Sequence, residues 1–136
     1  MRRAIEIILA GGLAVLLIGN GLAMLFAGPW WYGVVPGVPM TGPFNAHFVK
    51  DIGAAYLVSG AALAAFAWRP APALPALAVG AAFLALHAAI HVADAIASPI
   101  CGQALARDFP GVFLPALVSL GLVASRALPT KELRHA

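Results

Sequence analysis

Two histidines and an aspartate in the third apolar segment of this chain have residue types and a spacing that suit chemistry. His87, His91 and Asp94 stand at i, i+4 and i+7. At about 100° per residue, their side chains leave a helix within about 60° of one another. They therefore form one polar stripe on an otherwise apolar helix. Ionisable side chains are costly inside a membrane, so we interpret this stripe first as a functional site.

A second polar group opens the apolar segment that precedes this stripe. His47, Lys50 and Asp51 stand at i, i+3 and i+4, so they share one helix face. Asn45 precedes them, and Asn20 lies in the outer half of the first apolar segment. Antiparallel neighbouring helices would bring these side chains and the stripe to one level near a membrane boundary.

A transition-metal site is the first chemistry that these residues predict. Imidazole and carboxylate suit zinc, iron or copper, and a His-x-x-x-His pair on one helix can chelate a single ion. The expected ligands, with the carboxylates as ligands or as partners of the imidazoles, are His47, His87, His91, Asp94 and Asp51. The expected supporting residues are Asn45, Lys50 and Asn20. Such a site would serve metal sensing, metal delivery or a redox reaction.

Two features narrow the metal chemistry. Ala88 follows the first histidine of the pair, where zinc proteases of the His-Glu-x-x-His type carry glutamate. Haem held by His47 and one histidine of the stripe needs a wide gap between helices. Closely packed, Ala-rich helices disfavour that gap, so haem ranks below a bare metal ion.

Two alternatives to a metal site remain open. A His–Asp pair can act as general acid and base on a lipid-like or quinone-like substrate that enters from the bilayer. The same residues can also be structural, with Lys50 paired to Asp94 or Asp51 and Asn45 capping its helix. In that case the protein is an accessory or assembly subunit of a larger membrane complex, or a homo-oligomer.

Composition predicts the elements that position these residues. Apolar residues make up 62% of the 136 residues and charged residues 10%, whereas soluble domains carry about 25% charged residues. We therefore expect one integral membrane domain, 1–136, that folds as an all-α, four-helix transmembrane bundle. The four apolar segments, each near the roughly 20 residues that a spanning helix needs, cover about 4–27, 46–68, 76–97 and 109–125.

Basic residues predict the orientation of these spans. The six expected in the cytoplasm are Arg2, Arg3, Arg69, Arg126, Lys131 and Arg134, and the two expected outside are Lys50 and Arg107. Both termini then face the cytoplasm of a bacterium whose inner membrane holds the protein. The basic residues form no patch, so nucleic acid is not an expected partner. We expect Glu6 to pair with Arg2 or Arg3.

The two outer loops, 28–45 and 98–108, differ in character. The first contains Trp30, Trp31 and Tyr32, which are typical of the aromatic belt at a lipid–water interface. It is too apolar to extend into water, so we expect it to fold over the outer end of the bundle, as a lid or as an interfacial turn. The second contains Cys101, a lone thiol that can form no disulfide within the chain.

The segments 45–53 and 87–94, together with the layout of most of the chain, resemble the DoxX-like group of small four-helix bacterial inner-membrane proteins. This resemblance implies the membrane-spanning fold and carries no assigned reaction. The layout is also similar to that of four-helix membrane isomerases of the sterol-isomerase type. The acidic pair expected at the bundle centre of that family is not evident here, so no catalytic residue is carried over.

Overall fold

The computed structural model describes residues 1–97 and 101–127, and in this part of the chain every regular element is helical. The elements are α1 (Arg2–Phe26), α2 (Gly28–Val34), the 3₁₀ turn η1 (Val38–Thr41), α3 (Ala46–Trp68), α4 (Pro70–Ala97), α5 (Cys101–Asp108), the π-helical turn η2 (Phe109–Phe113) and α6 (Leu114–Ala127). Lys131 and Arg134, which the expected orientation uses, lie outside the described residues.

Four helices in the described part are long and apolar enough to cross a membrane, and the chain is a membrane protein of all-α fold. The first three are α1, α3 and α4, and the fourth combines α5, η2 and α6. Large apolar side chains point outward along all of them and are more than half exposed, as at Ile8, Leu16, Val58, Val79 and Leu117. Lipid rather than water would cover such a surface.

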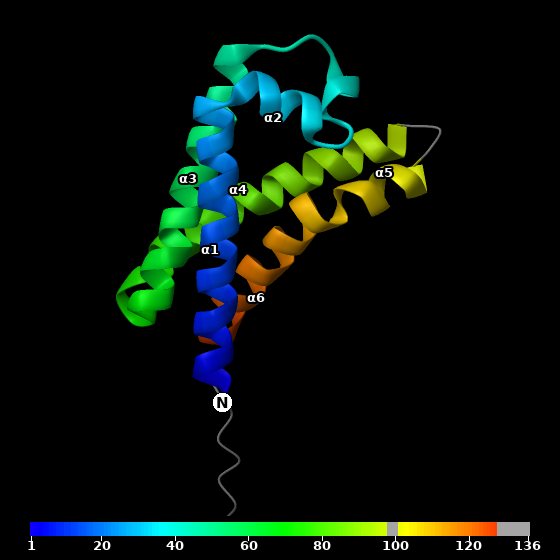
Figure 1. The fold of residues 1–136 in the computed structure, drawn as a ribbon. Helices are drawn as coiled ribbons and strands as arrows, with labels where there is room; N and C mark the ends of the chain where they lie inside the picture. The colour runs from blue at the N-terminus through cyan, green and yellow to red at the C-terminus, as the bar shows by residue number, and fades with distance from the viewer. Residues whose placement is uncertain (98–100, 128–136) are drawn as a thin grey trace, which may run out of the picture.

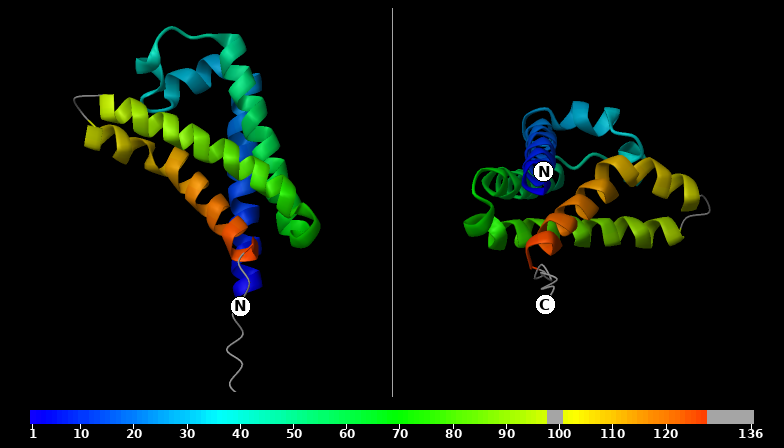
Figure 2. Two further views of the ribbon diagram at one scale, coloured as in Figure 1. Left: turned by 180° about the vertical axis from the view of Figure 1, so that it is seen from behind. Right: turned by 90° about the horizontal axis from the view of Figure 1, so that it is seen from below.

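The four spans form two hairpins that diverge toward one end of the molecule (Figures 1 and 2). α1 and α3 lie side by side, and α4 pairs with α5 and α6. We call the end at which α1 and α4 finish the loop end, and the opposite end the terminal end. Residues 28–45, which we call the strap, cross the loop end between the two hairpins.

Small residues set the closest helix contacts. A Cβ atom on Gly21 of α1 would lie 2.7 Å from the carbonyl oxygen of Gly53 on α3, and one on Gly60 would lie 2.7 Å from Ile18. On α4, a Cβ atom on Gly80 would lie 3.3 Å from the Cα atom of Ser59. Small residues permit this approach in membrane helices.

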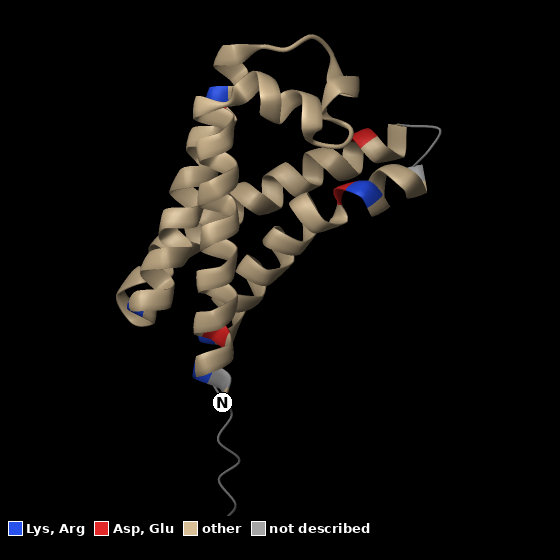
Figure 3. Ribbon diagram, in the orientation of Figure 1, with Lys and Arg blue, Asp and Glu red and all other residues tan. Residues whose placement is uncertain are grey.

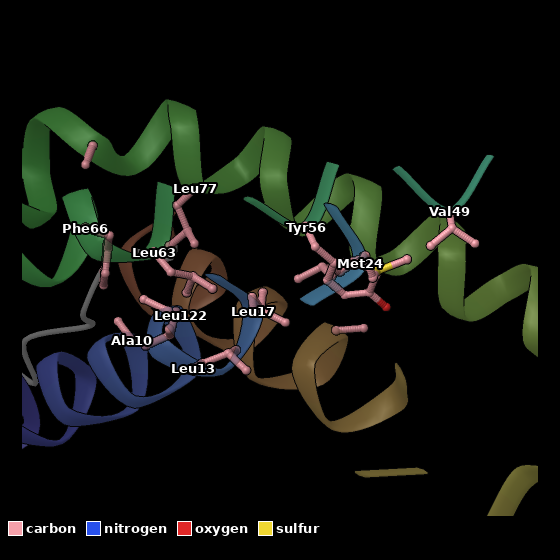
Figure 4. Close-up of a cluster of buried hydrophobic side chains, with 14 residues drawn as sticks. Ala10, Leu13, Leu17, Met24, Val49, Tyr56, Leu63, Phe66, Leu77 and Leu122 are labelled. Atoms are coloured by element: carbon pink, nitrogen blue, oxygen red, sulfur yellow. The ribbon is translucent and has the colours of Figure 1, made fainter. Parts of the chain in front are cut away.

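The buried side chains meet along the junction of the helices. Figure 4 shows Leu13 and Leu17 of α1, Leu63 of α3, Leu77 of α4 and Leu122 of α6 pointing toward a common interior, and all five are buried. On α1 the buried positions recur every three or four residues, which is the pattern of a helix with one packed face.

The observed bounds differ from the expected ones at two of the spans, while α3 covers the expected 46–68. α4 begins at Pro70 rather than at residue 76, because proline is compatible with the first turn of a helix, where no N–H partner is needed. The fourth span begins well before residue 109, because α5 and η2 continue α6 through residues expected in a loop.

Among the described residues, Lys, Arg, Asp and Glu gather at the two ends of the molecule, and the middle of each span holds none of them (Figure 3). α4 has 28 residues and is therefore about 42 Å long, more than the roughly 30 Å of a hydrocarbon core. A helix of this length fits a bilayer when it is tilted, and Figure 1 shows α4 inclined to α1.

Candidate functional site at the loop end

A hydrogen bond between α4 and α5 forms the centre of the polar cluster at the loop end. The Nδ1 atom of His91 lies 2.8 Å from Oδ2 of Asp108. An ionised carboxylate only accepts hydrogen bonds, so Nδ1 carries the proton and donates it. The two side chains are 31% and 10% exposed, so the pair is half-sheltered rather than solvated. This arrangement leaves Nε2 of His91 without a proton when the ring is neutral.

Aromatic rings extend from this pair toward the middle of the membrane span. Phe83, His87 and His91 follow one another at i, i+4 and i+8 on α4, and we call them the ring ladder. The His87 and His91 ring centroids lie 4.7 Å apart, edge to face, and His87 stacks on Phe83 at 6.0 Å. Tyr56 of α3 packs edge-on against Phe83 and His87, at 5.9 and 5.8 Å. The deeper histidine is therefore held by apolar neighbours.

The guanidinium of Arg107 binds the other side of the Asp108 carboxylate. Its Nε atom donates to Oδ1 at 2.6 Å and its Nη2 atom to Oδ2 at 3.2 Å. A two-pronged contact of this kind is among the stronger hydrogen-bonded ion pairs. Asp108 is thus fixed between a cation and an imidazole.

The π-helical turn η2 directly follows Asp108 and sets its position. Pro115 lacks the N–H that an α-helix would direct at the carbonyl four residues back, and the N–H of Leu114 bonds to the carbonyl of Phe109, five residues back. A π turn adds one residue and rotates the preceding helix by about 100°. The turn therefore decides which face of α5 meets α4.

The structure brings together only part of the residue set that the sequence predicts. His87 and His91 are in contact, but Asp94 is exposed and Asp108 occupies the position expected for it beside His91. His47 and Asp51 form their own pair on α3, with Nε2 and Oδ2 3.4 Å apart and side chains 90% and 61% exposed. They do not join the ring ladder, because α3 and α4 are close at Gly80 and diverge toward the loop end.

Two of the three predicted supporting residues have other roles. Asn45 caps α3, since its side-chain oxygen accepts from the backbone N–H groups of His47 and Phe48, each at 3.1 Å. Asn20 accepts a hydrogen bond of 2.7 Å from Nε1 of Trp31 and so docks α2 onto α1. Lys50 is exposed on α3.

A complete ligand set for a metal ion does not converge within the described residues. No three His, Cys, Asp or Glu side chains of that part of the chain are grouped so that they could hold one ion. His87 and His91 are two possible ligands whose rings are in contact, and the Asp108 carboxylate orients the ring of His91. The transition-metal site stays a prediction.

Sequence reasoning missed Asp108, Arg107 as its partner, and Tyr56. Asp108 stands at the start of the fourth apolar segment, so it is the third acidic residue, after Asp51 and Asp94, that the topology places at the loop end. That position was a usable signal. The rotation by η2, which turns Asp108 toward His91, has no comparable signal in the sequence.

A second polar cluster lies at the terminal end. Glu6 of α1 is buried, pairs with Arg126 of α6 and accepts a hydrogen bond of 3.1 Å from Ser125. The sequence predicted a pairing with Arg2 or Arg3, and the side chain of Arg2 lies outside the part that the structure describes. The structure shows a partner on α6, where the last helix returns to the start of the first. An apolar groove of about 260 Å³ adjoins this cluster, lined by Glu6, Leu9, Val118, Gly121, Leu122 and Ser125.

Comparison with protein-family models, with curated proteins and with solved structures finds no match for this chain. The geometry of the loop end therefore carries the functional argument.

Proposed function

We propose that this protein is a membrane enzyme in which His91, oriented by Asp108, transfers protons to and from a lipid-like or quinone-like substrate. The hydrogen bond of 2.8 Å between His91 Nδ1 and Asp108 Oδ2 is the observation that carries this proposal. A carboxylate that holds one imidazole nitrogen leaves the other free to act as a general base, and it stabilises the imidazolium that forms.

The surroundings of the pair favour an apolar substrate. His87, Phe83 and Tyr56 form an aromatic wall beside it, and the pair lies at one end of the spans rather than in a soluble domain. In the proposed reaction, Nε2 of His91 takes a proton from a C–H group of the substrate. The imidazolium exchanges protons with water and then gives one to the same or a neighbouring carbon atom, so no oxidant or other reactant is needed.

A metal ion held by His87 and His91 is the second candidate. The 4.7 Å between their rings supports it, as does the carboxylate behind His91, since metal-bound histidines usually donate their second N–H to such a group. Zinc, iron or copper would suit these ligands. Its remaining ligands would have to come from water, substrate or residues outside the described part.

We further propose that the loop end faces the periplasm and that the protein lies in a bacterial inner membrane. The excess of Lys and Arg at the terminal end supports this orientation, with Arg3, Arg69 and Arg126 among the described residues there. The proposed substrate would then be a lipid of the outer leaflet of that membrane or a quinone within it.

Deuterium incorporation into lipids tests the acid–base proposal without knowledge of the substrate. The purified protein is reconstituted into vesicles of total bacterial lipid that include quinones, incubated in D₂O, and the lipids are analysed by mass spectrometry. We expect one lipid class to gain deuterium with the wild type, and the rate to fall by about 10² or more in His91→Gln and Asp108→Asn.

The exposed pair on α3 supplies the matched control, because His47→Gln removes a histidine at the same end of the molecule that is paired with Asp51 instead. His47→Gln should keep the wild-type rate. Exchange that survives in His91→Gln, or vesicles in which no lipid gains deuterium, would contradict the proposal. Exchange that is lost in a chelator and restored by zinc would favour the metal centre.

A further inference from the structure

The strap touches the polar cluster at Gly37. Its backbone is left-handed, with φ of 87°, a conformation that favours glycine. A Cβ atom on Gly37 would lie 2.4 Å from Cζ of Arg107 and 2.6 Å from its Nε and Nη1 atoms. The guanidinium therefore lies directly on the strap backbone, in a space that any side chain at this position would fill.

The strap is itself anchored on the opposite hairpin. Nε1 of Trp31 donates to Asn20 of α1 at 2.7 Å, and the hydroxyl of Tyr32 donates to the carbonyl of Gly42. The Tyr32 ring packs edge-on against Phe44, with centroids 5.4 Å apart. The surface that Gly37 presents to Arg107 is thus held in place from α1, across the gap between the two hairpins.

A continuous row of contacts leads from this surface to the proposed general base. Gly37 packs on Arg107, whose Nε and Nη2 atoms bind the two oxygens of Asp108 at 2.6 and 3.2 Å. Oδ2 of the same carboxylate accepts from Nδ1 of His91 at 2.8 Å. A guanidinium that is free to turn would allow Asp108 to turn with it, because both oxygens are bound to one rigid, planar group.

We propose that Arg107 is a positioning residue and that Gly37 of the strap fixes it. Arg107 holds Asp108 in the orientation that keeps the proton of His91 on Nδ1 and leaves Nε2 free. The strap thereby controls which nitrogen of His91 is available at the loop end. This inference rests on the proposed function for the role of Nε2, whereas the hydrogen-bonding state of His91 can be measured without any substrate.

The test reads the tautomer of His91 by ¹⁵N NMR, in protein labelled at its histidine rings and held in lipid nanodiscs at about pH 8, where a free imidazole is neutral. The His91→Gln variant assigns the signals. In the wild type we expect the Nδ1–H tautomer to predominate. Gly37→Ala displaces the guanidinium, and Arg107→Gln removes it without altering the strap. Each should shift the ratio of the two tautomers toward Nε2–H by roughly tenfold, the worth of a charge-assisted hydrogen bond.

Gly33→Ala is the control, since Gly33 lies in the same strap, in α2, and no atom lies within 4 Å of its added Cβ. It should leave the tautomer ratio of His91 unchanged. A ratio unchanged in Arg107→Gln but altered in Asp108→Asn would overturn the positioning role and leave the His91–Asp108 pair standing. A ratio unchanged in Asp108→Asn would overturn the pair, and with it the proposed function. An equal shift in Gly33→Ala and Gly37→Ala would also overturn the proposed contact of Gly37 with Arg107.

Discussion

At the scale of single residues, the two aspartates near His91 offer a direct comparison. Asp108 binds His91 and Arg107, whereas Asp94 is exposed on α4. Asp108→Ala leaves a half-sheltered imidazole N–H and a guanidinium without their acceptor, which should lower the free energy of unfolding by about 1 to 3 kcal/mol. Unfolding by SDS in mixed micelles, followed by circular dichroism, measures this loss.

The control is Asp94→Ala, which should change the free energy of unfolding by no more than about 0.5 kcal/mol, as is usual for exposed positions. Equal losses in the two variants would mean that the contacts of Asp108 contribute nothing specific to the fold. A larger loss in Asp94→Ala would indicate that Asp94 is the partner of His91, as its spacing on α4 predicts.

Residue types and spacing predicted the contact between His87 and His91, because both lie on one helix and the helix period alone aligns them. The same reasoning also aligned Asp94 with them, yet a shared helix face does not decide which partner a side chain finds. His91 is satisfied from α5, a different element. Contacts between elements depend on crossing angles and turns, and one sequence contains no direct record of either.

At the scale of elements, the closeness of α1 and α3 depends on glycines that look alike in the sequence but differ in their surroundings. A Cβ atom on Gly21 would lie 2.7 Å from a backbone oxygen of α3, whereas one on Gly19 would meet no atom within 4 Å. Gly21→Ala should therefore lower the free energy of unfolding by about 1 to 3 kcal/mol, because a backbone must move.

Gly19→Ala is the control on the same helix and should be neutral or should stabilise the protein by up to about 1 kcal/mol, since alanine favours the helix. SDS unfolding measures the free energy of unfolding of both variants. If Gly21→Ala is as stable as Gly19→Ala, then α1 and α3 do not pack as closely as these distances require.

Apolar length and composition were enough to predict four spans, because a helix that crosses a bilayer needs about 20 apolar residues whatever its neighbours are. They did not predict where α4 begins or that α5 continues into α6. Pro70 lies in the loop expected between the second and third spans, yet it stands in the first turn of α4. Proline ends a helix only where its missing N–H or its ring is incompatible with the preceding turn.

At the scale of the whole molecule, the two hairpins are joined at the terminal end and bridged by the strap at the loop end. The joint contains the ion pair of Glu6 with Arg126, whose guanidinium also lies over the Phe66 ring. Arg126→Gln removes the Arg126 cation from a buried carboxylate, so it should cost on the order of 3 kcal/mol of unfolding free energy. Stability of the variant in mixed micelles measures this cost.

A double-mutant cycle separates the pair from its surroundings. Glu6→Gln combined with Arg126→Gln should cost less than the sum of the single variants. The double variant removes both charges of the pair, whereas each single variant removes only one. Arg69→Gln is the matched control at the same end, since its guanidinium stacks on Trp68 at 4.8 Å and forms no ion pair with a described residue. Strictly additive costs would show that Glu6 and Arg126 act independently.

The orientation of the molecule decides which compartment can supply or receive the substrate of the His91–Asp108 pair. The chain has one cysteine, Cys101, and α5 begins with it at the loop end. If the loop end faces the periplasm, a membrane-impermeant maleimide added to intact spheroplasts should label the wild type. Cys101→Ser combined with Ala127→Cys moves the thiol to the terminal end and should be labelled only after the membrane is opened.

The reverse pattern would place the terminal end outside, against the distribution of Lys and Arg. The strap and the site would then face the cytoplasm, and the substrate would have to reach them from that side.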